Sequence, residues 1–193
     1  RRIRAKAESL GLSFNQCHAP YQMDMKPWLE GERTHILHLL TTAIRLAGIL
    51  GAKNVVVHPV QCMNYLNSDP EWVKQVNVEF YSALIPAAKA AGVSIAIENM
   101  WQRHLWNKSI VSSVCSSPYE LKSYVDACNA VAPVFTACLD IGHCLLNGSF
   151  QTLVVNFANL AFSNYKVDCL FFRQVLICSY DILQQMRANL KVV

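Results

Sequence analysis

The sequence predicts an α/β protein in the form of an incomplete (β/α)8 barrel with parallel strands. Short apolar runs recur about every forty residues, each run leads to a polar residue, and the segments between them show helical periodicity. Repeated strand–helix units of this kind form parallel sheets with right-handed crossovers. Because none of these strands leads into a glycine-rich turn of the nucleotide-binding type, the barrel is favoured over an open doubly wound sheet.

Four apolar runs supply the expected strands, and their composition is typical of buried parallel strands. These runs are residues 12–18, 54–58, 93–98 and 134–140. The spacings between the polar residues at their ends are 40, 40 and 42 residues, so the ends are in phase. These end residues are His18, His58, Glu98 and Asp140.

The segments between the strands carry helix signals. The predicted helices cover residues 32–50, 69–91 and 117–129. Asp69 is a suitable N-cap and Pro70 a suitable first helical residue, while Ser117 and Glu120 fit a capping box. Glycines that precede three of the strands predict left-handed helix ends. They are Gly11, Gly51 and Gly92.

Composition changes after residue 148. Residues 149–193 contain no Gly, Pro, His, Trp or Glu, although average usage would give about three Gly and two Pro. Because α/β units use Gly and Pro in turns and caps, we expect a partial barrel over residues 1–148. We expect residues 149–193 to be an atypical segment that continues or caps the same domain, and a frameshift or truncation would explain it. We interpret the chain as an excerpt from a longer product, since it does not begin with Met.

The overall composition excludes several classes of protein. With 53% hydrophobic and 16% charged residues and a mean hydropathy of +0.21, the chain suits a globular core and not a disordered protein. No apolar run reaches the roughly 18 residues of a membrane helix. The net charge of +4 is too mild to indicate nucleic acid as a partner. Eight cysteines without CxxC spacing predict reduced thiols and a cytoplasmic location.

The four strand-end residues predict a divalent-metal site. Strands of a parallel barrel place their carboxyl ends at one mouth, where these two histidines and two carboxylates would converge. Imidazole and carboxylate are ligands for Zn, Mn, Co or Fe, and carboxylates also suit Mg. His143, three residues after Asp140, could face the same mouth. A lone strand-end histidine is more often a hydrogen-bonded structural residue, but the regular spacing favours a joint role.

Residues 100–116 predict a long loop at the same mouth. Loops of this kind often cover substrate, so Trp101 and Trp106 could stack on a sugar, although surface packing explains them equally well. His35 and His38 are three residues apart on a predicted helix, where we expect them to be ordinary surface residues.

Five segments together resemble the xylose isomerase-like TIM-barrel superfamily, and its sugar phosphate isomerase/epimerase branch fits best. The IEN and LDIGH motifs are the specific ones, and the order and spacing of all five strengthen the resemblance over roughly residues 1–148. The segments are CHAPY (17–21), NVVVHP (54–59), IAIENMW (95–101), CSSPYEL (115–121) and CLDIGH (138–143).

The resemblance implies roles for particular residues. Glu98 resembles the family's metal-binding glutamate that also acts as an acid and base, and Asp140 resembles its metal-binding aspartate. His18, His58 and His143 resemble residues that contact substrate, or bind further metal in the related endonuclease IV branch. The implied cofactor is a divalent metal (Mn, Mg, Co or Zn). The implied substrate is a sugar or sugar phosphate, whose proton moves through an enediolate.

The chain also departs from the family pattern. No His follows His143 and no Glu follows Glu120, so two expected downstream metal ligands are absent, and the family's first strand is missing. Besides an isomerase or epimerase, the alternatives are an endonuclease IV-like DNA-repair hydrolase and a non-catalytic partial barrel. The hydrolase needs more downstream ligands and a basic surface, and two or three ligands rarely suffice to hold a metal. Open sheet edges invite pairing, so a homo-oligomer that closes them is a further expectation.

Overall fold

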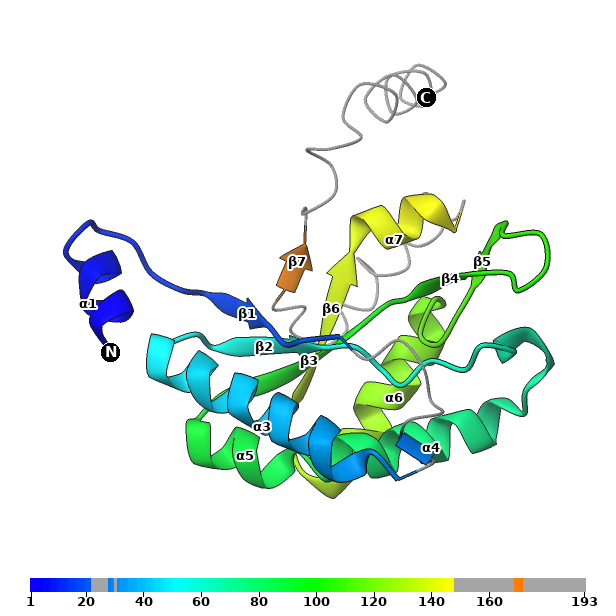
Figure 1. Ribbon diagram of the computed structural model, residues 1–193, viewed down its shortest axis with the longest axis horizontal. Helices are drawn as coiled ribbons and strands as arrows, with labels where there is room; N and C mark the ends of the chain where they lie inside the picture. Colours follow the sequence, from blue (N-terminus) through cyan, green and yellow to red (C-terminus); the bar gives the residue numbers. More distant parts are fainter. Residues whose placement is uncertain (22–27, 30, 148–168, 172–193) are drawn as a thin grey trace, which may run out of the picture.

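A five-stranded parallel sheet forms the centre of the computed structural model, which describes residues 1–21, 28–29 and 31–147 and the backbone of 169–171 (Figure 1). The strand order is β1-β2-β3-β6-β7, and within the described residues the sheet stays open. Its strands are β1 (Gln16–His18), β2 (Asn54–Val57), β3 (Ser94–Glu98), β6 (Phe135–Asp140) and β7 (Cys169–Phe171). The predicted α/β class with parallel strands is confirmed, although β1 is shorter than the predicted run.

Four helices cover one face of this sheet, as Figure 1 shows: α3, α4, α5 and α6. The main core lies between them and the sheet, and Val55, Ile95 and Ile97 are fully buried in it. None of the described helices has both the length and the apolar character needed to cross a membrane. The helical elements are α1 (Arg2–Glu8), α3 (Arg33–Leu50), η1 (Tyr65–Asn67), α4 (Pro70–Ser82), α5 (Ile85–Ala91), α6 (Pro118–Val131) and α7 (Ile141–Leu146).

Most of the predicted helix ends are confirmed. Gly51 and Gly92 end α3 and α5 in the left-handed conformation, with φ of 83° and 65°. Asp69 caps α4, since its carboxylate accepts a hydrogen bond from the Glu71 amide. The predicted capping box at Ser117 is wrong, because the Ser117 side chain makes no cap hydrogen bond.

The predicted helix over 69–91 consists of two helices. α4 ends at Ser82 and α5 begins at Ile85, with Pro86 in its first turn. A proline has no amide hydrogen to donate, and its ring clashes with the carbonyl four residues earlier. For Pro86 that carbonyl belongs to Ser82, so the chain cannot continue α4 through this position.

The predicted loop over 100–116 contains a short hairpin. β4 (Trp101–Arg103) and β5 (Ile110–Ser112) pair as antiparallel strands outside the main sheet. In Figure 1 the hairpin extends beyond the carboxyl end of β3. The segment after the third predicted strand is therefore an ordered structure that can form one wall of a site.

The second face of the sheet carries a smaller buried cluster. Side chains alternate along a strand, so the residues between those of the main core point away from the helices. Val56, Ala96 and Cys138 form this cluster, one from each of three neighbouring strands. Glu98 and Asp140 follow on the same side at the carboxyl ends of β3 and β6, because each lies two residues beyond a member of the cluster.

The proposed division of the chain at residue 148 stays a prediction. Apart from the backbone of β7, residues 149–193 lie outside the described part of the structure. β7 pairs in parallel with β6 and adds a strand that the sequence did not predict.

Candidate metal centre

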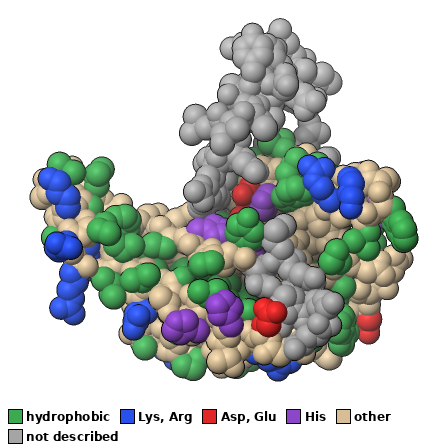
Figure 2. All heavy atoms as spheres, viewed as in Figure 1, with side chains coloured by type: hydrophobic (Ala, Val, Ile, Leu, Met, Phe, Trp, Pro, Cys, Tyr) green, Lys and Arg blue, Asp and Glu red, His purple; other side chains and the backbone are tan. Residues whose placement is uncertain are grey.

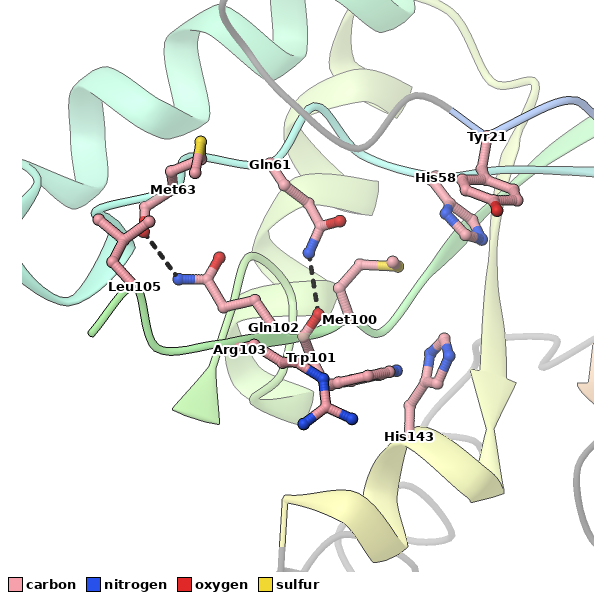
Figure 3. Close-up of a pocket in the computed structure, with 10 residues that line it drawn as sticks. All are labelled: Tyr21, His58, Gln61, Met63, Met100, Trp101, Gln102, Arg103, Leu105 and His143. Atoms are coloured by element: carbon pink, nitrogen blue, oxygen red, sulfur yellow. Dashed lines mark hydrogen bonds between the residues drawn. The ribbon is translucent and has the colours of Figure 1, made fainter. Parts of the chain in front are cut away.

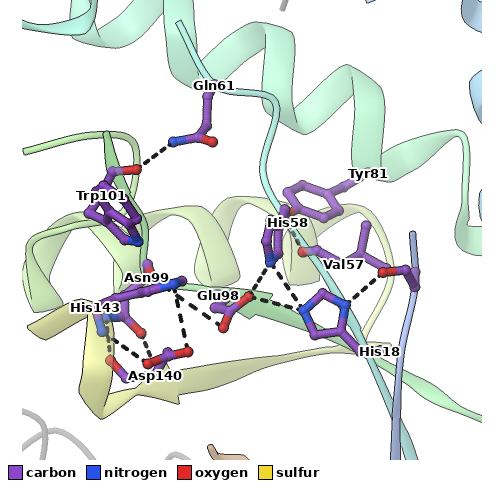
Figure 4. A network of polar contacts seen from close by, with 11 residues as sticks. His18, Val57, His58, Gln61, Tyr81, Glu98, Asn99, Trp101, Asp140 and His143 are labelled. Atoms are coloured by element: carbon purple, nitrogen blue, oxygen red, sulfur yellow. Dashed lines mark hydrogen bonds and ion pairs between the residues drawn. The ribbon is translucent and has the colours of Figure 1, made fainter. Parts of the chain in front are cut away.

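The carboxyl ends of four neighbouring strands bring the predicted site residues together. Each residue is the last of its strand, except His58, which directly follows β2. Figure 4 shows their side chains pointing toward one another above the sheet. In Figure 2 histidine and acidic side chains gather near the middle of the visible face. These residues are His18, His58, Glu98 and Asp140, and His143 from α7 joins them.

Glu98 lies at the centre of the group and is 2% exposed. Its Oε2 is 2.6 Å from Nε2 of His58 and 3.5 Å from Nε2 of His18. Its Oε1 is 4.0 Å from Nδ1 of His143. One buried carboxylate therefore faces three imidazole rings.

Backbone carbonyls fix the orientation of two of these rings. Nδ1 of His18 lies 2.6 Å from the carbonyl oxygen of Ala19, and Nδ1 of His143 lies 2.7 Å from that of Asn99. A carbonyl oxygen only accepts, so each Nδ1 carries a hydrogen. This arrangement, in which one ring nitrogen donates to a carbonyl, is common among metal-binding histidines.

Asn99 holds Asp140 and His143 in place. Its side-chain amide donates to the Asp140 carbonyl at 3.0 Å and accepts from the Asp140 amide at 2.6 Å. Its backbone carbonyl accepts from the His143 ring. Asp140 in turn caps α7, because its Oδ1 accepts from the His143 amide at 2.9 Å. The fully buried Asn99 therefore links the ends of β3 and β6 to the first turn of α7.

The two carboxyl groups have opposite electrostatic surroundings. Burial raises the pKa of Glu98, but the neighbouring His18 and His58 rings outweigh burial and lower this pKa to about 2. Burial raises the pKa of Asp140, and His143 only partly opposes this effect. Glu98 is therefore a carboxylate throughout the neutral range, although it is almost fully buried.

The donor atoms form two sets that share Glu98. One set is His18, His58 and Glu98, and the other is Glu98, Asp140 and His143, with the potential ligand atoms of each set within 4.8 Å of one another. His18 Nε2 also lies 3.1 Å from His58 Nε2. Imidazole nitrogens and carboxylate oxygens at these separations suit Zn, Mn or Co. The residues present therefore fit a divalent cation, with Glu98 common to both sets.

A cavity of about 550 Å³ opens beside the metal centre (Figure 3). His58 and His143 form part of its wall, and the Tyr21 ring stacks on the His58 ring with centroids 5.6 Å apart. The predicted Trp101 also lines the cavity, with its ring centroid 6.3 Å from that of His143. Trp106 is 86% exposed and does not line it, so the two tryptophans do not act as a pair there.

Sequence reasoning missed several residues of the site. Asn99 directly follows Glu98 in the IEN motif, and Tyr21 ends the CHAPY segment, but neither was assigned a role. Gln61 was missed as well, and it donates to the Trp101 carbonyl at 3.0 Å and so fixes the start of the hairpin. Their positions just after strand ends, within or beside the segments that resemble the family, are the signal in the sequence that could have found them.

The fold and the arrangement at the strand ends agree with a match over residues 1–167 to the xylose isomerase-like TIM barrel family. The chain belongs to this family. No curated protein matches it.

Several solved structures share this fold. A D-tagatose 3-epimerase-like protein has a TM-score of 0.63 and 20% identity, and the match covers 82% of this chain and 56% of that one. An L-ribulose 3-epimerase has a TM-score of 0.55 and 16% identity, with 75% and 46% covered. An AP endonuclease of family 2 from Brucella melitensis has a TM-score of 0.55 and 14% identity, with 80% and 58% covered. The chain thus spans about half the length of these structures.

Proposed function

We propose that this chain carries part of the active site of a metal-dependent sugar isomerase or epimerase. The observation that carries the proposal is the buried, ionised Glu98 at the centre of three histidines and Asp140, beside an open cavity. Membership in the xylose isomerase-like family and the similarity to two structures named as sugar epimerases support it. The substrate would be a small sugar or sugar phosphate.

Glu98, Asp140 and His143 would hold the divalent metal, while His18 and His58 contact substrate or hold a further ion. When bound, the metal would polarise the sugar carbonyl and so acidify the C–H of the carbon next to it. Nε2 of His143 would face the metal because the His143 ring donates from Nδ1 to the backbone.

Glu98 would accept the proton from the sugar carbon next to the carbonyl. Its low pKa keeps it in the form that accepts a proton at neutral pH. Returning that proton to the neighbouring carbon on the same face, while the hydroxyl proton of that carbon passes to the former carbonyl oxygen, gives isomerisation. Inversion at a single carbon would need a second acid on the opposite face of the sugar.

We also place the protein in the cytoplasm. Five cysteines form no disulfide, which agrees with a reducing compartment: Cys17, Cys62, Cys115, Cys128 and Cys144.

Metal content and sugar conversion test the proposal together. The purified chain is loaded with Mn, Co, Zn or Mg in turn, bound metal is measured by mass spectrometry, and a panel of ketoses and ketose phosphates is assayed. We expect at least one divalent ion per chain and conversion of at least one sugar. A chain that binds no divalent metal, or binds it without converting any sugar in the panel, would be the non-catalytic partial barrel.

A second candidate is an endonuclease IV-like hydrolase. The observation that favours it is the second donor set, His18, His58 and Glu98, since hydrolysis at phosphate commonly uses more than one metal ion. The similarity to a structure named as an AP endonuclease agrees with this. Cleavage of abasic DNA that is lost in Glu98→Gln would favour the hydrolase, and no cleavage together with sugar conversion would exclude it.

A further inference from the structure

The cavity beside the metal centre has two chemically different ends. In Figure 3 the rings of Tyr21, His58 and His143 lie at one side, and Met63 and Leu105 lie at the other. The volume of about 550 Å³ falls within the roughly 300–1,000 Å³ of pockets that enclose drug-sized ligands. The cavity therefore has room for more than the part of a ligand that faces the metal centre.

The end away from the metal is apolar and open to solvent. Met63 and Leu105 are 53% and 40% exposed, and Met100 and Trp101 line the wall between them and the histidines. The same apolar surface continues outward, because Met63 and Leu105 also line a smaller hollow with Leu66 and Trp106. Exposed apolar side chains that are grouped in this way mark binding surfaces more often than single ones do.

Three polar side chains along the cavity have partners within the protein. The Gln61 amide donates to the Trp101 carbonyl, and the Gln102 amide donates to the Met63 carbonyl at 3.3 Å. The Arg103 guanidinium lies 5.7 Å from the centroid of the Trp101 ring and donates to the Lys108 carbonyl. These contacts hold the hairpin in place. Along Met100 and Trp101 the cavity wall is suited to apolar groups.

We propose that this cavity binds an apolar, planar group attached to the sugar, so that the substrate class is a glycoside or similar conjugate of a sugar that keeps a carbonyl group. This inference rests on the proposed function for the sugar end of the ligand. The hydroxyl groups of the sugar would face His58, His143 and the metal ligands. The attached group would lie along Met100 and Trp101 toward Leu105.

Paired ligands test this inference by calorimetry on the metal-loaded chain. Phenyl glucoside and methyl glucoside differ only in the attached group, and glucose 6-phosphate and phenol serve as further probes. We expect the phenyl glucoside to bind at least about tenfold more tightly than the methyl glucoside, because burial of a phenyl ring removes its apolar area from water. Equal affinities, no detectable binding of either glucoside, preference for glucose 6-phosphate, or phenol binding as tightly as phenyl glucoside would each overturn the proposal.

Variants at the exposed end of the cavity test where the phenyl group binds. Leu105→Ser and Met63→Ser should each reduce the preference for the phenyl group several-fold. Leu39→Ser on α3 is a matched control, because Leu39 is 41% exposed and does not line the cavity. A phenyl preference that survives in the Leu105→Ser and Met63→Ser double variant would show that the group binds elsewhere.

The binding measurement separates this inference from the proposed function. It requires no turnover, so a chain that prefers the phenyl glucoside but converts no sugar would refute the proposed reaction and retain the apolar subsite. A chain that converts free ketoses and shows no phenyl preference would refute the apolar subsite and retain the proposed reaction.

Discussion

The Asn99 side chain connects the carboxyl ends of β3 and β6 through two hydrogen bonds to the backbone of Asp140. Glu98, Asp140 and His143 were predicted from strand ends and spacing, because carboxylates and histidines at the ends of parallel strands have few structural reasons to recur in phase. An asparagine next to a strand end is common in turns, so its residue type alone did not single out Asn99. Only the structure shows its hydrogen bonds to the Asp140 backbone.

Asn99→Ala should weaken metal binding as well as stability. It leaves the buried amide and carbonyl of Asp140 without their partner, which costs roughly 2–4 kcal/mol of unfolding free energy. It also frees the ligands that Asn99 positions, so metal affinity should fall about 10–100-fold. Urea unfolding and calorimetric metal titration measure the two effects.

Asn129→Ala is the matched control for this variant. Asn129 makes the same pair of hydrogen bonds to the backbone of Phe135, at the opposite end of β6. Its loss should reduce stability but leave metal affinity unchanged. If both variants weakened metal binding equally, Asn99 would have only a general structural role.

At the scale of elements, the helix signals in the sequence were reliable where local chemistry decides the outcome. The Asp69 cap and the glycine at position 51 act within a few residues, and both are confirmed. Pro86 was a local signal that the prediction of one long helix ignored. The hairpin of β4 and β5 has only three residues in each strand, which is too short for a reliable alternating pattern.

Glu120 shows how tertiary contacts replace an expected local one. Instead of completing a capping box with Ser117, it accepts a hydrogen bond from the Tyr65 hydroxyl at 2.7 Å and so connects η1 to α6. Burial raises the pKa of Glu120 above its ordinary value of 4.5, and the Tyr65 hydroxyl only partly opposes this effect.

This contact predicts a pH dependence of stability. Because the pKa of Glu120 is higher in the folded chain, its contribution is fully present below about pH 4.5 and is lost as the pH rises through the folded pKa. Glu120→Gln keeps an acceptor for Tyr65 without the charge. The stability of this variant relative to the wild type should therefore increase from pH 4 to pH 7 in urea unfolding.

Tyr65→Phe provides an internal check on the pH dependence. It removes the hydroxyl donor that lowers the pKa of Glu120, so the loss of stability should extend to higher pH. A stability difference between Glu120→Gln and the wild type that does not change with pH would contradict this account.

At the scale of the whole molecule, the parallel sheet explains why residues far apart in the sequence form one site. The forty-residue period predicted the order of the strands, and the register then places His18 beside Val56 and Glu98 beside Cys138. What the period could not predict is the set of contacts between elements, such as the cavity wall that the hairpin supplies. Those contacts depend on side-chain packing, which repeat length does not encode.

Glu98 is proposed to move a proton at a carbon of a metal-bound sugar. The most direct measurement is NMR detection of deuterium incorporation from D2O into the sugar carbon, with the metal-loaded chain and the sugar it converts. Wild type and Glu32→Gln, which changes an exposed residue, should incorporate deuterium at similar rates. Glu98→Gln should be at least about 100-fold slower. Exchange that continues unchanged in Glu98→Gln would contradict the claim.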